Sequence, residues 1–438
     1  MLKSKLLSDI RKKIKNKRLK IAVIGLGYVG FPLALEFAKK GVKVVGIEID
    51  RDRLSSIARR SSYISDITNN ELRHVLAGGN FRASANFAEI KDADAVLICV
   101  PTPLKGKNLP DISFIKNAVK EAALHIKKQA LVVLESTTFP GTTEEEILPI
   151  FEKSGFRHEE DFFLCFSPER IDPGNKKFPV QKIPKVMGGL SPQATQLAME
   201  VYHIIIKQMV PVSSARAAET VKLLENTFRL INIGLIDELS MMAHKMKIDI
   251  WEVIQAASTK PFGFMPFYPG PGVGGHCIPK DPLYLHWKAK SFGFHSRFIK
   301  LASDLINYMP QYVVKRVNCA LLRRNRQLKG SKILVIGVTY KRDIKDLRKS
   351  PSIDVINCLK KQGAIVSYFD PIIPFLKIKG LDLESVRLND KKIKEFDCVI
   401  IATDHSAVDY SRLLENARLI FDTRNVFKGK YAQKVERL

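Results

Sequence analysis

A short apolar segment that leads into a glycine-rich turn most constrains how this chain can fold. Residues 20–24 are apolar and run directly into Gly25-Leu26-Gly27-Tyr28-Val29-Gly30. Residues 31–40 have helical composition, Gly41 suits the position after a helix, and residues 42–49 are typical of a second strand. The order strand, G-x-G-x-x-G, helix, strand is typical of a doubly wound parallel sheet, and it predicts a dinucleotide site.

Each glycine of this turn has its own task in such a site. Gly25 permits the tight turn, Gly27 lets a pyrophosphate approach the backbone, and Gly30 lets helix and strand pack closely. The helix N-terminus then faces the phosphates with its partial positive charge. We therefore also expect Tyr28 and Val29 at the cofactor.

A carboxylate at the end of the second strand predicts which dinucleotide is bound. Glu48 lies 18 residues after Gly30. A carboxylate there can accept hydrogen bonds from both ribose hydroxyls of the adenosine and repel a 2′-phosphate, so the sequence favours NAD over NADP. We count Arg53, in the following segment, among the cofactor residues.

Polar residues follow three further apolar segments of this half of the chain. Residues 95–100 lead into Pro-Thr-Pro, residues 130–134 into Glu-Ser-Thr-Thr, and residues 162–166 into Ser-Pro-Glu-Arg. Ligand contacts of doubly wound sheets gather just past the carboxyl ends of the strands. The cofactor residues expected there are Pro101, Thr102, Ser136 and Thr137. Since Pro140 and three glutamates follow, Ser136 and Thr137 could also cap a helix.

Composition narrows the class of protein and its compartment. A chain of 438 residues is too long for one core, so we expect two or three domains. Its six cysteines show neither disulfide-like nor metal-like spacing, which predicts no bound metal and suits a reducing cytoplasm. We expect Cys99, Cys165 and Cys398 in the core. No signal peptide or membrane span is visible, so no membrane insertion is expected.

The net charge of +26 raises the question of nucleic acid. The basic residues are spread along the whole chain, without a cluster interleaved with aromatic residues. We therefore favour a solvated basic surface that steers anionic small molecules, and expect no nucleic-acid partner. A basic, NAD-sensing nucleic-acid binder is the alternative from another class, and a gel shift at physiological salt separates the two.

A long amphipathic helix is predicted over residues 215–247, where apolar residues recur in steps of three and four. A helix of this length can join two α/β units and offer a face to a second subunit, so we expect a homodimer or higher homo-oligomer. Lys222 and Asn226 lie one turn apart on it, with Arg229 close to the same line. Residues of these types usually lie on the solvated surface, and they indicate a catalytic site only if a reactive group lies beside them.

That reactive group is expected in residues 269–281, where four glycines and two prolines within seven residues exclude a helix or strand interior. Such a loop lets another group approach the main chain closely. It ends with Cys277, a soft nucleophile, and with Asp281 four residues later. The alternative is a tight turn that ends in a small buried cysteine.

A second parallel-sheet unit is predicted from strands over residues 331–337, 364–368, 397–402 and 419–422. Its first turn lacks G-x-G-x-x-G, and Lys341 and Arg348 are the candidates to hold phosphate there. The predicted fold is thus α/β, with two Rossmann-like doubly wound parallel-sheet domains joined by a long central helix. The expected domains are a basic leader (1–20), an NAD-binding domain (20–212), a central helical domain (213–310) and a C-terminal domain (311–438).

Taken together, these motifs resemble those of the UDP-glucose/GDP-mannose dehydrogenase family, the nucleotide-sugar 6-dehydrogenases, from about Leu19 to Phe427. The matching motifs are Gly25–Gly30, Val100–Pro103, Glu135–Thr137, Ser167–Arg170, Lys222–Asn226, Gly274–Asp281 and Tyr340–Asp343 with Arg348. Residues 167–175 and 260–264 are most similar to the branch acting on UDP-N-acetylhexosamines, especially UDP-N-acetylglucosamine. UDP-N-acetylmannosamine, UDP-N-acetylgalactosamine and UDP-glucose are the alternative substrates.

The resemblance implies a four-electron oxidation of C6 of the sugar with two NAD+. Cys277 would attack the aldehyde formed first, and the thiohemiacetal would be oxidised to a thioester that water hydrolyses. Lys222 and Asn226 would stabilise the oxyanions. Asp281 and Glu169 are the candidate general bases, through a water shared with Thr137, and the sequence leaves open which of them acts.

The resemblance also implies a UDP-binding role for the C-terminal domain and the residues that contact the substrate. Lys341 would meet the diphosphate, and Arg348 would reach the cofactor or the closed interface. Lys260 stands where many members carry Arg, and in the family this position can reach a neighbouring subunit's substrate. The remaining substrate residues are Arg170, Arg229, Phe267, Tyr268 and Gly274, besides Glu169, Lys222 and Asn226.

A two-electron dehydrogenase of the β-hydroxyacid type is the alternative among enzymes. It shares the cofactor domain, the helical middle and a Lys–Asn pair one turn apart, but it has no use for Cys277 or for the last α/β unit. Counting NADH separates them, because the family reaction yields two NADH per sugar and the alternative yields one.

Overall fold

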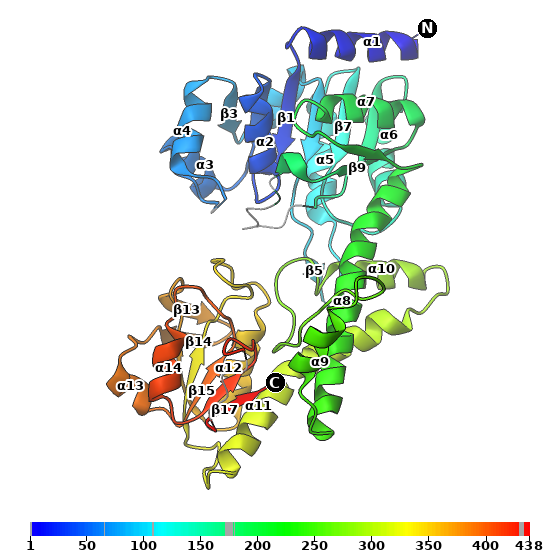
Figure 1. The fold of residues 1–438 in the computed structure, drawn as a ribbon. Helices are drawn as coiled ribbons and strands as arrows, with labels where there is room; N and C mark the ends of the chain where they lie inside the picture. The colour runs from blue at the N-terminus through cyan, green and yellow to red at the C-terminus, as the bar shows by residue number, and fades with distance from the viewer. Residues whose placement is uncertain (1, 65, 107–108, 171–177, 179, 429–432) are drawn as a thin grey trace. The chain divides into compact units, whose positions relative to one another are not determined.

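A computed structural model describes the chain apart from residues 1, 65, 107–108, 171–177, 179 and 429–432 (Figure 1). Two compact units emerge from it. We call Met1–Glu225 with Leu283–Phe294 the N-terminal unit, and Asn226–Pro282 with His295–Leu438 the C-terminal unit. The bounds of the four domains expected from the sequence stay a prediction.

The N-terminal unit is built on an eight-stranded sheet in the order β10-β9-β8-β7-β4-β1-β2-β3. All neighbouring strands pair in parallel except β8 and β9, which are antiparallel. The strands are β1 (Lys20–Ile24), β2 (Lys43–Ile47), β3 (Phe81–Ser84), β4 (Ala95–Ile98), β7 (Ala130–Leu134), β8 (Phe162–Phe166), β9 (Lys185–Gly189) and β10 (Met209–Pro211). The strand order reverses between β1 and β4, and ligands of doubly wound sheets bind outside the carboxyl ends of the strands at such a point.

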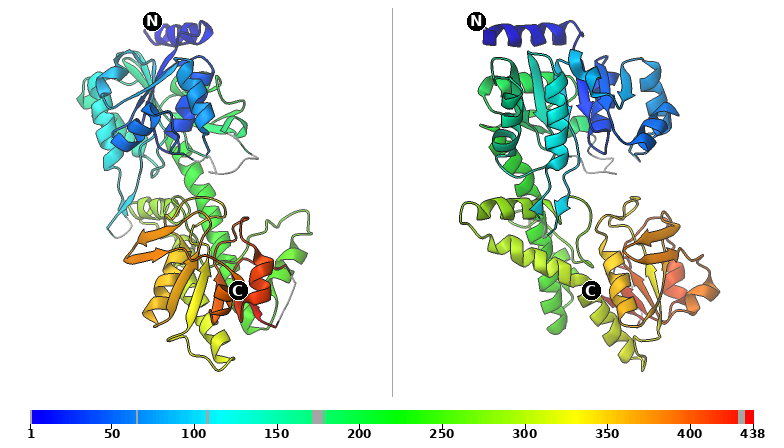
Figure 2. Two further views of the ribbon diagram at one scale, coloured as in Figure 1. Left: turned by 90° about the vertical axis from the view of Figure 1, so that its left-hand side faces the viewer. Right: turned by 180° about the vertical axis from the view of Figure 1, so that it is seen from behind.

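Helices cover both faces of this sheet (Figures 1 and 2). They are α2 (Gly30–Lys39), α3 (Arg51–Ala58), α4 (Asn69–Ala77), α5 (Ser113–His125), α6 (Leu148–Lys153) and α7 (Pro192–Tyr202), with short turns η1 (Phe87–Asp92), η2 (Thr142–Ile147) and η3 (Val180–Lys182) and a small hairpin of β5 (Leu104–Lys105) and β6 (Leu109–Pro110). Alternate residues of β1, β4 and β7 face two separate apolar clusters, one on each side of the sheet. The predicted strands of this half are therefore confirmed, with ends shifted by one or two residues.

The basic leader forms a helix that packs onto the N-terminal unit. Helix α1 (Leu2–Lys15) buries Ile10 in the same apolar cluster as α2 and α7. Arg11 forms an ion pair with Glu200 of α7 at 2.7 Å, and Lys13 contacts Asp94 at 2.9 Å. The leader thus has a structural role that its charge alone did not predict.

Four helices occupy the middle of the chain: α8 (Ala215–Lys245), α9 (Ile250–Ala257), α10 (Asp281–Lys290) and α11 (Arg297–Leu322). Helix α8 confirms the long predicted helix and ends two residues early. In the C-terminal unit α8 crosses α11 closely, since a Cβ on Gly234 would lie 3.1 Å from the Cα of Ala302. None of the helices in the described part of the chain is long and apolar enough to cross a membrane.

The C-terminal unit carries a second, all-parallel sheet in the order β12-β11-β15-β16-β17. Its strands are β11 (Lys332–Ile336), β12 (Ile365–Phe369), β15 (Cys398–Ile401), β16 (Ile420–Asp422) and β17 (Val435–Arg437), accompanied by α12 (Pro351–Lys361), α13 (Asp390–Lys394), α14 (Tyr410–Asn416) and an antiparallel hairpin of β13 (Phe375–Ile378) and β14 (Leu381–Glu384). The four predicted strands are confirmed, and β13, β14 and β17 were not predicted. Cys99, Cys165 and Cys398 are buried as expected.

Candidate active site

The glycine turn of the N-terminal unit leaves room where a pyrophosphate is expected. A Cβ on Gly30 would lie 2.0 Å from the carbonyl oxygen of Gly25, so only glycine allows this packing of α2. At Gly27 the nearest atom to a Cβ would be the Arg53 Nη1, 3.9 Å away, so the space above this residue is open. Helix α2 has no side-chain cap at Val29, but the Phe31 N–H donates to the carbonyl oxygen of Gly27 at 3.1 Å and Pro32 has no N–H, so an anion here would rely mainly on the N–H of Gly30.

Glu48 follows β2, and its carboxylate holds the glycine turn in place. The Oε2 atom accepts from the backbone N–H of Leu26 at 3.0 Å and from Arg53 Nη1 at 3.0 Å. The Oε1 atom accepts from the N–H groups of Ile49 and Asp50 at 2.9 and 3.1 Å. The side chain is 5% exposed. The structure therefore brings Glu48 to the turn, with four donors on it from the protein itself.

The residues at the ends of β4 and β7 pack against one another. Ser136 donates to the carbonyl oxygen of Val100 at 2.8 Å, and the carbonyl oxygen of Thr102 accepts from the Tyr284 hydroxyl at 2.5 Å. The helix-cap interpretation of Ser136 and Thr137 is wrong, because the helical turn η2 starts at Thr142 and Gly141 precedes it.

Glu169 and Arg170 follow β8, and both lie beside charged groups of the N-terminal unit. A carboxylate oxygen of Glu169 lies 3.9 Å from the ammonium of Lys185. Arg170 pairs with Glu225 at 2.7 Å and donates to the carbonyl oxygen of Pro184 at 2.7 Å. Pro101 is exposed and Thr137 is half-buried. Residues 171–175 of the sugar-branch motif lie outside the described residues.

Three predicted site residues follow one another along α8. Lys222 and Asn226, one turn apart, are 8% and 6% exposed, whereas Arg229 is exposed. An ammonium and an amide are costly to bury unless they have polar partners. The burial of Lys222 and Asn226 therefore distinguishes them from the solvated surface pair that the alternative interpretation expected.

In the C-terminal unit Cys277 lies in the turn that leads into α10. Its carbonyl oxygen accepts from the N–H groups of Lys280 at 3.0 Å and Asp281 at 2.8 Å, which closes the turn that starts the helix. Asp281 is the first residue of α10 and is fully buried. Its Oδ2 accepts from the Asn226 Nδ2 at 2.7 Å. The structure thus brings together Asn226 and Asp281, and it leaves Cys277, in the turn before Asp281, half-buried.

The chain's own side chains approach the bare backbone of the cysteine loop. Gly275 has a positive φ of 89°, and a Cβ there would lie 2.8 Å from the Cε2 of Tyr340. A Cβ on Gly274 would lie 2.5 Å from the Tyr340 Cβ. The Gly275 N–H donates to the carbonyl oxygen of Arg348 at 2.9 Å. The glycines of this loop therefore allow it to pack on the loop that carries Lys341.

Two buried charged residues of this loop's surroundings escaped the sequence analysis. Asp237 of α8 is fully buried and accepts from the Gly270 N–H at 3.0 Å. Lys280 is 6% exposed, and its ammonium lies 3.4 Å from His276 Nδ1 and 3.7 Å from Asp281 Oδ1. A basic residue between Pro279 and Asp281 was visible in the sequence, whereas nothing there linked Asp237 to a loop 33 residues away.

The aromatic residues of the same loop lie against helices of the C-terminal unit. Phe267 contacts Phe228 of α8 edge to face at 5.8 Å between ring centroids, and Tyr268 stacks on Trp251 of α9 at 5.9 Å. The ammonium of Lys260 lies 4.9 Å from the Phe262 ring. Tyr268 still exposes 56% of its surface, so one face of its ring remains accessible.

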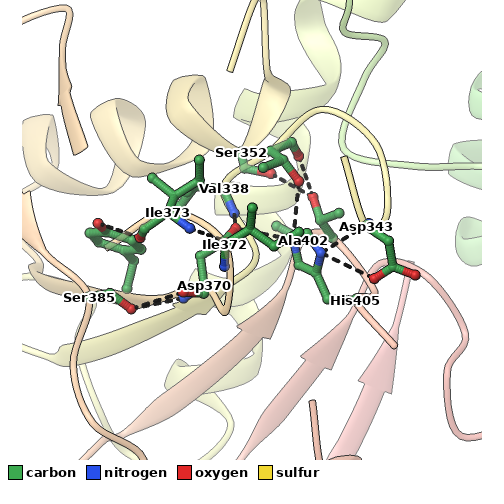
Figure 3. Close-up of polar contacts among 12 residues, drawn as sticks. Val338, Asp343, Ser352, Asp370, Ile372, Ile373, Ser385, Ala402 and His405 are labelled. Atoms are coloured by element: carbon green, nitrogen blue, oxygen red, sulfur yellow. Dashed lines mark hydrogen bonds and ion pairs between the residues drawn. The ribbon is translucent and has the colours of Figure 1, made fainter. Parts of the chain in front are cut away.

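A buried histidine network fixes the turn that carries Lys341 (Figure 3). His405 Nδ1 accepts from the Asp343 N–H at 3.1 Å, and its Nε2 lies 3.1 Å from Asp370 Oδ2. The same Asp370 oxygen accepts from the Val338 N–H at 2.7 Å. Burial alone would raise the pKa of Asp370, but the hydrogen bonds from His405 and from the N–H groups of Val338 and Ile372 outweigh it and lower the pKa. The turn is thus anchored at both ends.

Lys341 and Arg348 differ in their surroundings within this unit. Lys341 is half-buried, and its carbonyl oxygen accepts from the Thr339 hydroxyl at 2.9 Å. Arg348 is exposed and binds the Asp346 carboxylate through Nε at 3.0 Å and Nη2 at 2.6 Å. A ligand of Arg348 would have to share this guanidinium with Asp346.

Comparison with known domain families matches the chain in three consecutive segments. Residues 19–206 match the NAD binding domain of the UDP-glucose/GDP-mannose dehydrogenase family, residues 216–308 its central domain, and residues 334–429 its UDP binding domain.

Individual proteins extend this similarity over most of the chain. The UDP-N-acetyl-D-glucosamine 6-dehydrogenase of Pseudomonas aeruginosa is 39% identical over 357 residues, which cover 81% of this chain and 83% of that protein. The UDP-N-acetyl-D-mannosamine dehydrogenase of Pyrococcus horikoshii is 33% identical over 417 residues, 94% of this chain and 96% of that protein. A solved structure of UDP-D-ManNAc dehydrogenase from Pyrococcus horikoshii superposes with a TM-score of 0.87 at 31% identity, covering 96% of this chain and 99% of that one.

Proposed function

Because this chain belongs to the UDP-glucose/GDP-mannose dehydrogenase family and is an NAD-dependent nucleotide-sugar dehydrogenase, we propose that it oxidises C6 of a UDP-N-acetylhexosamine to the carboxylate. UDP-N-acetylglucosamine is the proposed sugar, since the P. aeruginosa relative carries that name and is 39% identical. UDP-N-acetylmannosamine is the first rival, because the P. horikoshii relatives carry that name.

The setting of Cys277 is the observation that carries the four-electron form of this proposal. The cysteine is half-buried at the start of α10, and the bonded pair of Asn226 and Asp281 is buried beside that start. A two-electron enzyme needs no nucleophile at such a position. A thiol that adds to the aldehyde forms a thiohemiacetal, which can be oxidised a second time by the same enzyme.

Residues of the glycine turn fit the cofactor. The open space at Gly27 and the uncapped start of α2 suit a pyrophosphate, with Tyr28 and Val29 beside it. Glu48 and Arg53 would lie at the adenosine, and Pro101, Thr102, Ser136 and Thr137 along the strand ends. When bound, each of two NAD+ takes up one hydride from the sugar carbon.

The chain's own residues would carry the sulfur chemistry. The thiolate of Cys277 adds to the C6 aldehyde, and the resulting oxyanion takes up a proton to give a thiohemiacetal. Loss of a hydride and a proton from this group gives the thioester. Water then attacks the thioester carbonyl, the C–S bond breaks, and the carboxylate leaves while the thiolate is regenerated.

Lys222 and Asn226 would stabilise the oxyanions that form at C6 during both additions. Lys222 supplies a buried cation, and Asn226 supplies the amide N–H that is not used by Asp281. Asp281 would then orient Asn226, since it is fully buried and already accepts its other N–H. We assign the general base to Glu169, which lies at a strand end, and we place the attacking water between Glu169 and Thr137.

The C-terminal unit would bind the UDP part of the substrate. Lys341 would contact the diphosphate from the anchored turn, and the accessible face of Tyr268 would pack on the nucleotide or the sugar. The remaining contacts of this proposal are Arg170, Arg229, Lys260, Phe267, Gly274 and Arg348.

Incubation of the purified protein with four UDP-sugars and NAD+ tests the proposal. UDP-N-acetylglucosamine should give two NADH and one uronic acid per sugar, ahead of UDP-N-acetylmannosamine, UDP-N-acetylgalactosamine and UDP-glucose. One NADH per sugar would refute the four-electron reaction. Preference for another of the four sugars would refute only the choice of substrate.

We also propose a homodimer or higher homo-oligomer that uses α8. Apolar side chains recur at seven-residue spacing on its exposed face, at Phe228, Leu235 and Met242, which are 46%, 50% and 50% exposed. An exposed apolar stripe of this kind marks a protein interface. Light scattering at micromolar concentration should show at least a dimer, and Leu235→Asp should lower the mass. A monodisperse wild-type monomer would exclude the interface.

A further inference from the structure

A buried lysine lies behind the strand end that carries Glu169. Lys185 opens β9 and is 7% exposed. Its ammonium lies 2.7 Å from Glu135 Oε2 and 3.9 Å from Glu169 Oε2. It also lies 5.3 Å from the centre of the Tyr202 ring, whose hydroxyl donates to Glu135 Oε1. The lysine therefore faces two carboxylates that end different strands of one sheet.

Both carboxylates of this cluster lie within ion-pair range of the Lys185 ammonium, and Glu135 is 1% exposed while Glu169 is 9% exposed. Burial alone would lower the pKa of Lys185, but the two carboxylates outweigh it and raise the pKa, so the lysine stays charged. Removing one member of a buried ion pair leaves an uncompensated charge. The Lys185 ammonium is therefore electrostatically linked to both carboxylates.

The two carboxylates interact with Lys185 in different ways. Glu135 is held from both sides, by the Lys185 ammonium at one oxygen and the Tyr202 hydroxyl at the other. Glu169 is in ion-pair range of the lysine but beyond hydrogen-bond distance. At this distance Lys185 acts on Glu169 mainly through its charge. Glu135 in turn fixes where that charge lies.

We propose that Lys185 is a positioning residue of the reaction, held in place by Glu135, whose charge keeps Glu169 ionised as the base that activates water. This inference rests on the proposed function, because it takes Glu169 as that base. Lys185 itself contacts neither sugar nor cofactor in this proposal. A proton taken from the attacking water is held on Glu169, while Lys185 keeps its own proton throughout.

Two single substitutions test the inference, one that removes a positive charge and one that removes a negative charge. The measurement is the pH dependence of kcat for uronic acid formation. Lys185→Met removes the cation and should move the acid limb of the profile up by about one to three pH units, the usual effect of an opposite charge at this range. Glu135→Gln removes the competing anion and should move the limb down. Lys185→Arg, which keeps the charge, should restore a limb close to that of the wild type.

If Lys185 had a purely structural role, its replacement would lower kcat at every pH and leave the acid limb of the profile at the same pH. An unmoved limb in both single variants would therefore overturn the inference. If Lys185→Met does not fold, Glu135→Gln and the double variant K185M/E135Q, which removes both members of the 2.7 Å ion pair, carry the test. The limb of the double variant should lie between those expected for the two single variants, and a limb of Glu135→Gln at or above the wild-type pH would overturn the inference. A wild type that makes one NADH per sugar fails the proposed function instead, so the two failures remain distinguishable.

Discussion

Asp237 offers a prediction in which the chemistry of one buried carboxyl group controls stability. It lies inside α8 and is fully buried, and its Oδ1 accepts from the Gly270 N–H at 3.0 Å. Among the residues that the structure describes, none gives its Oδ2 a hydrogen bond. Burial raises the pKa of Asp237 from 3.8 to about 8, although the Gly270 N–H and Arg424 oppose the shift. The group is therefore neutral in the folded protein at neutral pH.

A raised pKa in the folded state makes this residue destabilising as the pH rises. Below about pH 4 the carboxyl is neutral in both states. Between about pH 4 and pH 8 it ionises only in the unfolded chain, so the free energy of unfolding falls with pH. At about 1.4 kcal/mol for each pH unit, the shift from 3.8 to about 8 corresponds to a loss of about 6 kcal/mol.

Asp237→Asn should abolish this dependence, since the amide is neutral at every pH and its oxygen can still accept from Gly270. The assay is urea unfolding of both proteins between about pH 5 and pH 8. Trp251 reports on the C-terminal unit, where its Nε1 donates to the carbonyl oxygen of Leu438. Trp287→Phe in both proteins removes the only other tryptophan.

The difference in unfolding free energy, wild type minus variant, should fall steadily by about 1.4 kcal/mol for each pH unit. Its absolute value at one pH also contains the loss or gain of local packing, so only the slope is decisive. Parallel curves over the whole range would show that Asp237 is ionised in the folded protein. The reasoning from its burial would then be wrong.

Three further outcomes are expected. Cys277→Ser should stop uronic acid formation, whereas Cys319→Ser, at another half-buried cysteine, should not; continued acid production by the first variant would remove Cys277 from the mechanism. Lys222→Ala should lower kcat by about 10²–10³-fold if it is an oxyanion donor, and a loss confined to KM would assign it to binding alone. Gly275→Ala should destabilise the cysteine loop, because its Cβ would meet Tyr340 at 2.8 Å and its φ is 89°; a melting temperature equal to that of the wild type would contradict this, with Gly263→Ala, where φ is 70° and a Cβ meets open space, as the control for backbone strain.

Much of the fold followed from local patterns. Apolar segments such as residues 130–134 bury every residue, and the glycine turn needs glycine for reasons that its spacing already expresses. Helix α8 was visible because its apolar residues recur at helical spacing over 31 residues. In contrast, β17 is three residues long and only half-buried, so it carries too little pattern to be recognised.

The candidate site was less accessible from the sequence because its partners are far apart along the chain. Lys185 lies 50 residues from Glu135, and Gly275 meets Tyr340 from another segment. The glycines of the cysteine loop suggested the approach of a ligand, but a tyrosine of the same chain occupies that space. Residue types and spacing indicated which groups are reactive. Only the structure could show which buried charges surround them.

The four donors on Glu48 have a consequence for engineering the coenzyme preference. Exchanging this carboxylate for a small neutral side chain, to admit a 2′-phosphate, would also remove the acceptor of the Leu26, Ile49 and Asp50 N–H groups, and the Leu26 N–H is the buried one of the three. An unpaired buried donor costs about 1–3 kcal/mol. Redesign toward the phosphorylated coenzyme must therefore rebuild the segment from Ile49 to Arg53 as well. The carboxylate that selects the coenzyme also holds this segment and the glycine turn together through hydrogen bonds.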